Sequence, residues 1–280
     1  LFNPRKSNPY FLKDYYLSDN LWYLISIKML KNLYKKNNLT FDSSLDAEIK
    51  LLEENIKLFI DHVIQKNLLT SILPVSSATY QNIRLLDVVE GISIIPSLSS
   101  DMRAHIKTSI KFIENNLMQN GLLLSFSNPV GFPVEKNLQL SNFYCSQRSP
   151  QAYLLLKKLT SHCLNTGNFP DSIHPISSGG SHHEGHSSKC SALFIESTLK
   201  LIFNDSQDTY LEFFPGFPEK WFTNPSKPFI LKNCPSRYGK FSCQLITKKD
   251  HIEFNFSHSF WKKPKYFIFN LPKEIISFQF

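Results

Sequence analysis

NFPDSIHPISSGGSHHEGH, residues 168–186, holds four of the nine histidines of this 280-residue chain. It follows a helix that Pro150 can open and precedes an apolar helix predicted over 187–203. Glycine pairs let a loop adopt backbone conformations that other residues resist. Polar loops held by a rigid scaffold often carry functional groups. The segment is therefore the first candidate for chemistry in this chain.

Apolar residues at helical spacing predict helices on both sides of this segment. Six are expected before residue 205, over 14–37, 43–66, 82–95, 101–119, 150–164 and 187–203. The polar stretch 125–145 contains proline and glycine and is predicted as an interruption. Successive helices with short connections are typical of an all-α, hairpin-based architecture.

The composition changes after the last predicted helix. Prolines gather between Pro215 and Pro235, and alternating apolar residues then predict short strands. The sequence therefore indicates three parts: an α-helical portion (1–205), a Pro-rich connector (206–228) and a small antiparallel β domain (229–280).

Charge and cysteine usage exclude several classes of function. The formal net charge is +8, but only five of the 31 basic residues are arginines, so nucleic-acid binding is not expected. No apolar run approaches the roughly 18 residues of a membrane helix. Five cysteines, an odd number without a CxxC pair, favour free thiols in a reducing compartment, and we expect a cytoplasmic protein.

Three interpretations of residues 168–186 are open from the residue types alone. His182 and His186 are four residues apart and could share a metal ion, although the HExxH spacing is missing. The histidines could instead only hydrogen-bond a tight loop. In the third interpretation Glu184 is a catalytic carboxylate and the neighbouring histidines bind a polyhydroxy substrate.

The segment resembles the late motif HPxxxGGxxxDGH of six-hairpin, (α/α)6-barrel glycosidases. The matching residues are His174, Pro175, Gly179, Gly180, Gly185 and His186, with Glu184 at the acidic position. LEFFPGFPEKW (211–221) is similar to the family's LLPGIPEEW segment, and NCPSRYG (233–239) to its NxPTRFG entry into a β-sandwich. Near the start, YLSDNLW (16–22) resembles the family's YWDDFW helix.

The resemblance implies a mainly α fold, an (α/α) helical-hairpin barrel followed by a small antiparallel β domain. Twelve helices with connections need about 200 residues at the least, whereas six are predicted here. We therefore expect an incomplete barrel: either another chain segment supplies its N-terminal half, or the protein is a remnant of such an enzyme. The chain begins with Leu1, and an upstream portion is expected.

The implied activity is inverting hydrolysis of a glycosidic bond in an oligo- or disaccharide, without metal or cofactor. Such a reaction needs a general base and a general acid. Glu184 is assigned as the base and Asp19 as the acid, with Asp87 and Asp171 in reserve. Asp19 could equally balance a helix dipole. The residues expected to line the sugar site are Tyr16, Trp22, His182, His183 and His186. The alternative is a non-catalytic carbohydrate-binding or structural remnant of such an enzyme.

Overall fold

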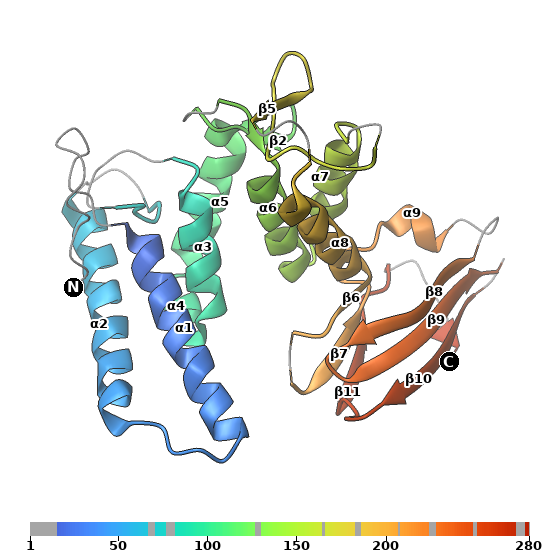
Figure 1. Cartoon of the computed structure of the whole chain (residues 1–280), viewed down its shortest axis with the longest axis horizontal. Helices are drawn as coiled ribbons and strands as arrows, with labels where there is room; N and C mark the ends of the chain where they lie inside the picture. Colours follow the sequence, from blue (N-terminus) through green and yellow to red (C-terminus); the bar gives the residue numbers. More distant parts are fainter. Residues whose placement is uncertain are drawn as a thin grey trace. The chain divides into compact units, whose positions relative to one another are not determined.

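A computed structural model describes most of the chain, in two compact units (Figure 1). The described residues are 16–66, 71–76, 82–126, 130–163, 166–182, 186–206, 208–223, 228–248, 251–272 and 278–279. Unit 1 ends at Phe132 and unit 2 begins at Pro133. The boundaries predicted after residues 205 and 228 both lie within unit 2.

Unit 1 consists mainly of helices. They are α1 (Leu17–Lys36), α2 (Ser43–Lys66), α3 (Leu85–Ile94), α4 (Pro96–Asp101) and α5 (Arg103–Phe112). A π-helical turn, η1 (Ile113–Leu117), leads into the hairpin of β1 (Met118–Gln119) and β2 (Leu122–Leu123). The predicted helices at 14–37 and 43–66 are confirmed as α1 and α2, and Leu21, Leu24 and Ile60 of their apolar stripes are fully buried. Met29 and Leu33, near the end of α1, are exposed.

The packing of α1 against α3 explains why a glycine lies in the middle of α3. Gly91 is buried within α3, and a Cβ atom at this position would lie 3.0 Å from Cβ of Leu21 in α1. The missing side chain lets the two helices approach closely at Leu21, which is fully buried. Gly91 therefore serves helix packing despite its low helix propensity.

The first part of unit 2 contains helices and three short strands. β3 (Phe132–Pro133) leads into α6 (Val134–Ser146), α7 (Gln151–Thr160), β4 (Ser172–Ile173), β5 (Gly180–His182) and α8 (Ser188–Ile202). α6 packs against both α7 and α8. β3, β4 and β5 form a small sheet in that order.

The rest of unit 2 consists mainly of strands. They are β6 (Phe203–Asn204), β7 (Tyr210–Phe213), β8 (Phe229–Ser236), β9 (Gly239–Thr247), β10 (Ile252–Phe260), β11 (Tyr266–Phe269) and β12 (Phe278–Gln279), with one short helix, α9 (Glu219–Phe222). One sheet has the order β12-β10-β9-β8 and another the order β11-β7-β6. β6 and β7 pair into this β part of unit 2 as well. Both strands precede residue 229, where the β domain was predicted to start.

An aromatic core lies between these two sheets. Phe213 of β7 contacts Phe241 of β9, Phe254 of β10 and Phe269 of β11 with ring centroids 5.2–5.7 Å apart. Phe254 and Phe269 also contact each other, at 5.1 Å. Alternation along β9 and β10 turns these phenylalanines inward and leaves polar residues on the outer face. The outer face of the larger sheet is consequently polar.

A buried carboxylate ties the helices of unit 2 to its sheets. Glu212 of β7 is 4% exposed. It accepts hydrogen bonds from Arg148 Nε at 2.9 Å, Asn270 Nδ2 at 2.9 Å and Asn204 Nδ2 at 3.2 Å. Because a buried charge needs such partners, Glu212 fixes the loop after α6 against β6 and β7.

The predicted fold class, a mainly α hairpin barrel, is wrong. Among the residues that the structure describes, no ring of helices closes, and four small sheets accompany the helices. The physical reason is that the helices of residues 1–205 fall into two compact units and do not surround one shared core. Moreover α3, α4 and α5 have only ten, six and ten residues, too short for the long paired hairpins of a barrel.

Candidate functional site

The Gly- and His-rich segment lies where α8 of unit 2 begins (Figure 1). β4 and β5 pair antiparallel, with Ser172 opposite His182 and Ile173 opposite Gly180. The hydroxyl of Ser181 donates to the carbonyl of Ser172 at 3.2 Å. This small hairpin sets the path of the chain toward α8.

His174 holds the turn between β4 and β5. Its Nδ1 accepts hydrogen bonds from the backbone N–H groups of Ile176 and Ser177, at 3.3 and 3.2 Å. Its own backbone N–H donates to the carbonyl of Gly179 at 2.7 Å. For His174, the interpretation that the histidines only hydrogen-bond a tight loop therefore applies, because its Nδ1 accepts hydrogen bonds from the backbone of the turn.

Polar side chains surround the first turn of α8. Ser187 caps the helix by accepting from the N–H of Cys190 at 3.3 Å. Nδ2 of Asn168 lies 3.3 Å from Nδ1 of the exposed His186. In the same turn, Lys189 forms an ion pair of 2.7 Å with Glu135 of α6. The starts of α6 and α8 thus share one polar end.

Asp171 belongs to this polar end as well. Its backbone carbonyl accepts from the N–H of Val134 at 3.0 Å, which joins it to the first residue of α6. Its Oδ1 lies 3.9 Å from Sγ of Cys190, the distance of a weak thiol hydrogen bond. Asp171 is partly exposed.

The predicted general base and its neighbours lie outside the described residues. These are His183, Glu184 and Gly185. The backbone of His182 lies in β5, but its side chain is also outside the description. The roles assigned to these residues therefore stay predictions.

The predicted general acid lies in the other unit. Asp19 is an exposed residue in the first turn of α1, where its charge favours the helix dipole. The hydroxyl of the buried Ser18 lies 3.4 Å from its Oδ1. Asp87 is likewise in the first turn of a unit 1 helix, α3. The structure does not bring Asp19 and the described part of segment 168–186 together in one unit.

The two aromatic residues predicted to line the sugar site differ in accessibility. The guanidinium carbon of Arg84 lies 4.0 Å from the centroid of the Tyr16 ring, so a cation covers one face of that ring. Tyr16 also forms an isolated β-bridge with Ser76. Trp22 is 37% exposed, which leaves part of its ring open and argues against a purely core role.

A metal site is not formed by the described side chains. Within the ranges that the structure covers, no three His, Cys, Asp or Glu side chains gather closely enough to hold a metal ion. The side chain of His182 is outside those ranges, so the predicted pair of His182 and His186 is untested.

Three buried cysteines, Cys145, Cys234 and Cys243, are not activated nucleophiles. All five are free thiols, and four are buried. Burial raises the pKa of Cys145 and of Cys243 to about 12 and that of Cys234 to about 11. Because the thiolate is the reactive form, these residues stay protonated and inert at neutral pH.

The raised thiol pKa values predict a loss of stability at high pH. Unfolded thiols lose their protons near pH 9, whereas the buried ones hold them to about pH 12, so unfolding releases protons in this window. The free energy of unfolding should be unaffected by these groups below pH 9 and should fall as the pH rises toward 12. Urea denaturation at about pH 7 and about pH 10 measures this difference. Cys243→Ala should reduce the alkaline loss, and an unchanged loss would contradict the prediction.

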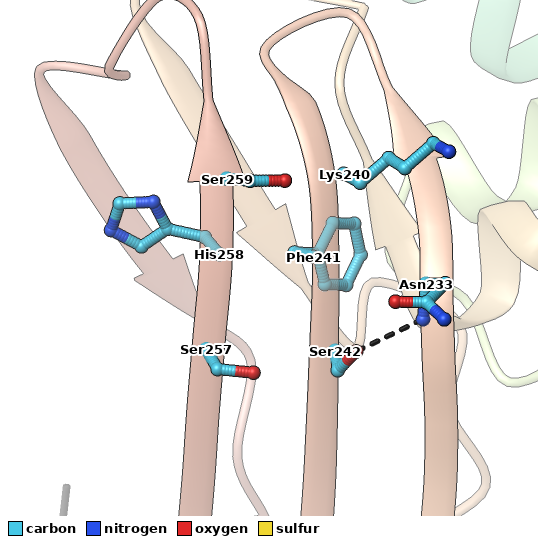
Figure 2. Close-up of a pocket in the computed structure, with 7 residues that line it drawn as sticks. All are labelled: Asn233, Lys240, Phe241, Ser242, Ser257, His258 and Ser259. Carbon is cyan, nitrogen blue, oxygen red and sulfur yellow. Dashed lines mark hydrogen bonds between the residues drawn. The ribbon is translucent and has the colours of Figure 1, made fainter.

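A second polar site was not predicted from the sequence. A groove of about 180 Å³ lies on the β8-β9-β10 sheet of unit 2 (Figure 2). Its lining residues are Asn233, Lys240, Phe241, Ser242, Ser257, His258 and Ser259. The only signal in the sequence was the alternation of polar and apolar residues in 239–247 and 252–257, which is also typical of an ordinary solvent-facing sheet.

Comparisons with protein-family models, with curated proteins and with solved structures found no match. No helix in the described ranges combines the length and the apolar character needed to cross a bilayer.

Proposed function

We propose that this chain is a glycoside hydrolase-like protein in which Glu184 is the general base for inverting cleavage of an oligo- or disaccharide. One observation carries the proposal: the described parts of segment 168–186 meet the first turns of α6 and α8 in a polar end of unit 2. Hydroxyl, amide, imidazole, carboxylate and ammonium groups gather there, as recognition of a polyhydroxy ligand requires.

We further propose Asp171, the reserve candidate, as a second candidate for the general acid beside Asp19. Asp171 lies in the same unit as the segment and immediately precedes β4, whereas Asp19 lies in unit 1. Its partial exposure allows contact with a leaving group. The other described carboxylate of this polar end, Glu135, is paired with Lys189 at 2.7 Å and is less suited to proton transfer.

Glu184→Gln tests the assignment of the base. The change keeps the size of the side chain and removes its basicity, so sugar release should fall about 10²–10⁴-fold while the circular dichroism spectrum stays unchanged. The measurement is reducing-sugar release from a panel of α- and β-linked disaccharides, with the anomer of the first product followed by NMR.

Two further variants act as controls. Asp171→Asn should also lower sugar release, most for substrates with poor leaving groups, whereas Glu135→Gln should keep most of the activity. Wild-type activity in Glu184→Gln would remove this residue from the mechanism. An absence of sugar release from every disaccharide by the wild type would favour the alternative function, non-catalytic saccharide binding. That alternative is supported by the polar groove on the sheet.

We also propose that the protein works in the cytoplasm. Five free cysteines, buried or half-buried without a disulfide between them, support a reducing compartment.

A further inference from the structure

The groove in unit 2 is built from three neighbouring strands. Ser257 of β10 is opposite Ser242 of β9, and Ser259 is opposite Lys240, so these four side chains share one face of the sheet (Figure 2). His258 points away from Ser257 and Ser259, and its ring stacks on Phe260 at 4.3 Å. The accessible groups of the groove are therefore hydroxyls, an ammonium group and an amide.

A β-bulge brings the amide into this groove. The ladder between β8 and β9 shifts register between Leu231 and Cys234, and Asn233 has a positive φ of 50°. The backbone N–H of Asn233 donates to the hydroxyl of Ser242 at 2.9 Å. Bulges re-aim side chains out of the regular alternation. Here the bulge places Asn233 beside Ser242, whose hydroxyl keeps its own proton for a ligand.

The charge around the groove is positive. Lys240 lines it, and no carboxylate is among the lining residues. Lys232 in the bulge and Lys262 and Lys263 after β10 are exposed. Glu253, which lies on the same strand as Ser257, is paired with Lys248 at 3.8 Å, and Asp208 is paired with Arg237 at 2.8 Å. The site therefore complements a negatively charged ligand.

An exposed indole follows β10, two residues after Ser259 of the groove. Trp261 directly follows β10 and is 75% exposed. A Cβ atom on Gly239 would lie 3.2 Å from Cδ1 of Trp261, and Gly239 precedes Lys240 in β9. An exposed aromatic ring offers a flat apolar surface to the C–H face of a sugar. A bare inorganic anion would make no use of it.

We propose that this face of the β8-β9-β10 sheet binds an acidic saccharide, an oligosaccharide that carries carboxylate groups. Lys240 pairs with a carboxylate, the serines and Asn233 bind hydroxyls, and Trp261 supports a neighbouring ring. The groove of about 180 Å³ is smaller than the roughly 300–1,000 Å³ of enclosed ligand pockets, so it suits one unit of a chain that lies across the sheet. The lining contains no arginine, which disfavours phosphate as the target.

Binding of hexagalacturonate to the full chain tests this proposal by isothermal titration calorimetry. Lys240→Gln and Trp261→Ala should each weaken binding about tenfold or more, because each removes a direct contact. Lys157→Gln makes the same charge change on an exposed residue of α7 and should leave the affinity within about twofold. Neutral maltohexaose should bind at least tenfold more weakly than hexagalacturonate.

Three results would overturn the proposal: no binding of hexagalacturonate, equal loss in Lys157→Gln and Lys240→Gln, or tighter binding of single-stranded oligodeoxythymidylate. The last result would identify a nucleic-acid surface instead. The site does not depend on the chemistry proposed for Glu184. Glu184→Gln should leave hexagalacturonate binding unchanged, so failure of one proposal is distinguishable from failure of the other.

Discussion

Replacing Phe213 with alanine is expected to lower the free energy of unfolding of unit 2 by about 3–5 kcal/mol. Phe213 is fully buried and contacts six aromatic rings, with centroids 5.2–6.4 Å away. These rings come from β9, β10 and β11 and from the residue after β7. The cavity would therefore open between the two sheets, where little can move to fill it. Urea denaturation followed by circular dichroism measures the loss.

Phe267→Ala is the matched control. It removes the same atoms from the same cluster, but Phe267 is 44% exposed and contacts Phe213 from the edge strand β11. Its loss should be about 1 kcal/mol, since a half-exposed ring contributes less transfer free energy and leaves no closed cavity. Equal losses in the two variants would show that Phe213 is not the centre of this core.

The local structure was predictable where apolar periodicity was strong. The expected helices at 43–66 and 187–203 correspond to α2 (Ser43–Lys66) and α8 (Ser188–Ile202). α6 was missed because its buried face includes Asn137 and Ser141, which are fully buried and hydrogen-bonded to the carbonyls of Pro133 and Ala152. Polar residues in the core conceal a helical stripe from a sequence pattern.

The arrangement of the helices was not predictable in the same way. Periodicity shows which face of a helix is buried but does not identify the partner that covers it. The barrel interpretation depended on one shared core for residues 1–205, and the structure divides this range after Phe132. Likewise β7 contains the buried carboxylate of Glu212, whose partners Arg148 and Asn270 lie 64 and 58 residues away in the chain. Such long-range pairing leaves no local signal.

The two candidate sites differ in what the sequence could reveal. The segment 168–186 is conspicuous because histidine and glycine are concentrated in it, and the structure assigns one of these histidines, His174, to a turn. The groove on the sheet carries no unusual residue types. It depends on the bulge at Asn233 and on the register that sets Ser257 opposite Ser242, and both are set by strand pairing.

Gly239→Ala should be among the most damaging small changes in unit 2, with an expected loss of about 2–6 kcal/mol. Gly239 has a φ of 128°, a conformation that L side chains rarely adopt. An added Cβ would lie 2.5 Å from the carbonyl oxygen of Ser259 and 2.9 Å from Cα of Phe260, and both are backbone atoms of β10. Backbone strain of about 1–3 kcal/mol and overpacking of about 1–3 kcal/mol therefore act together.

Gly167→Ala separates these two effects. Gly167 also lies in unit 2 and has a φ of 79°, but no atom of the described chain lies within 4 Å of a Cβ added there. Its loss should be only the conformational cost of about 1–2 kcal/mol. In the ladder between β9 and β10, Gly239 pairs with Phe260, and the next pair is Lys240 with Ser259. Relief of the clash at Gly239 must therefore separate β9 from β10 at the end of the groove. Gly239→Ala should thus weaken hexagalacturonate binding as well as folding. Gly167→Ala should affect stability alone. Equal stability losses in the two variants would contradict the close contact of Gly239 with β10.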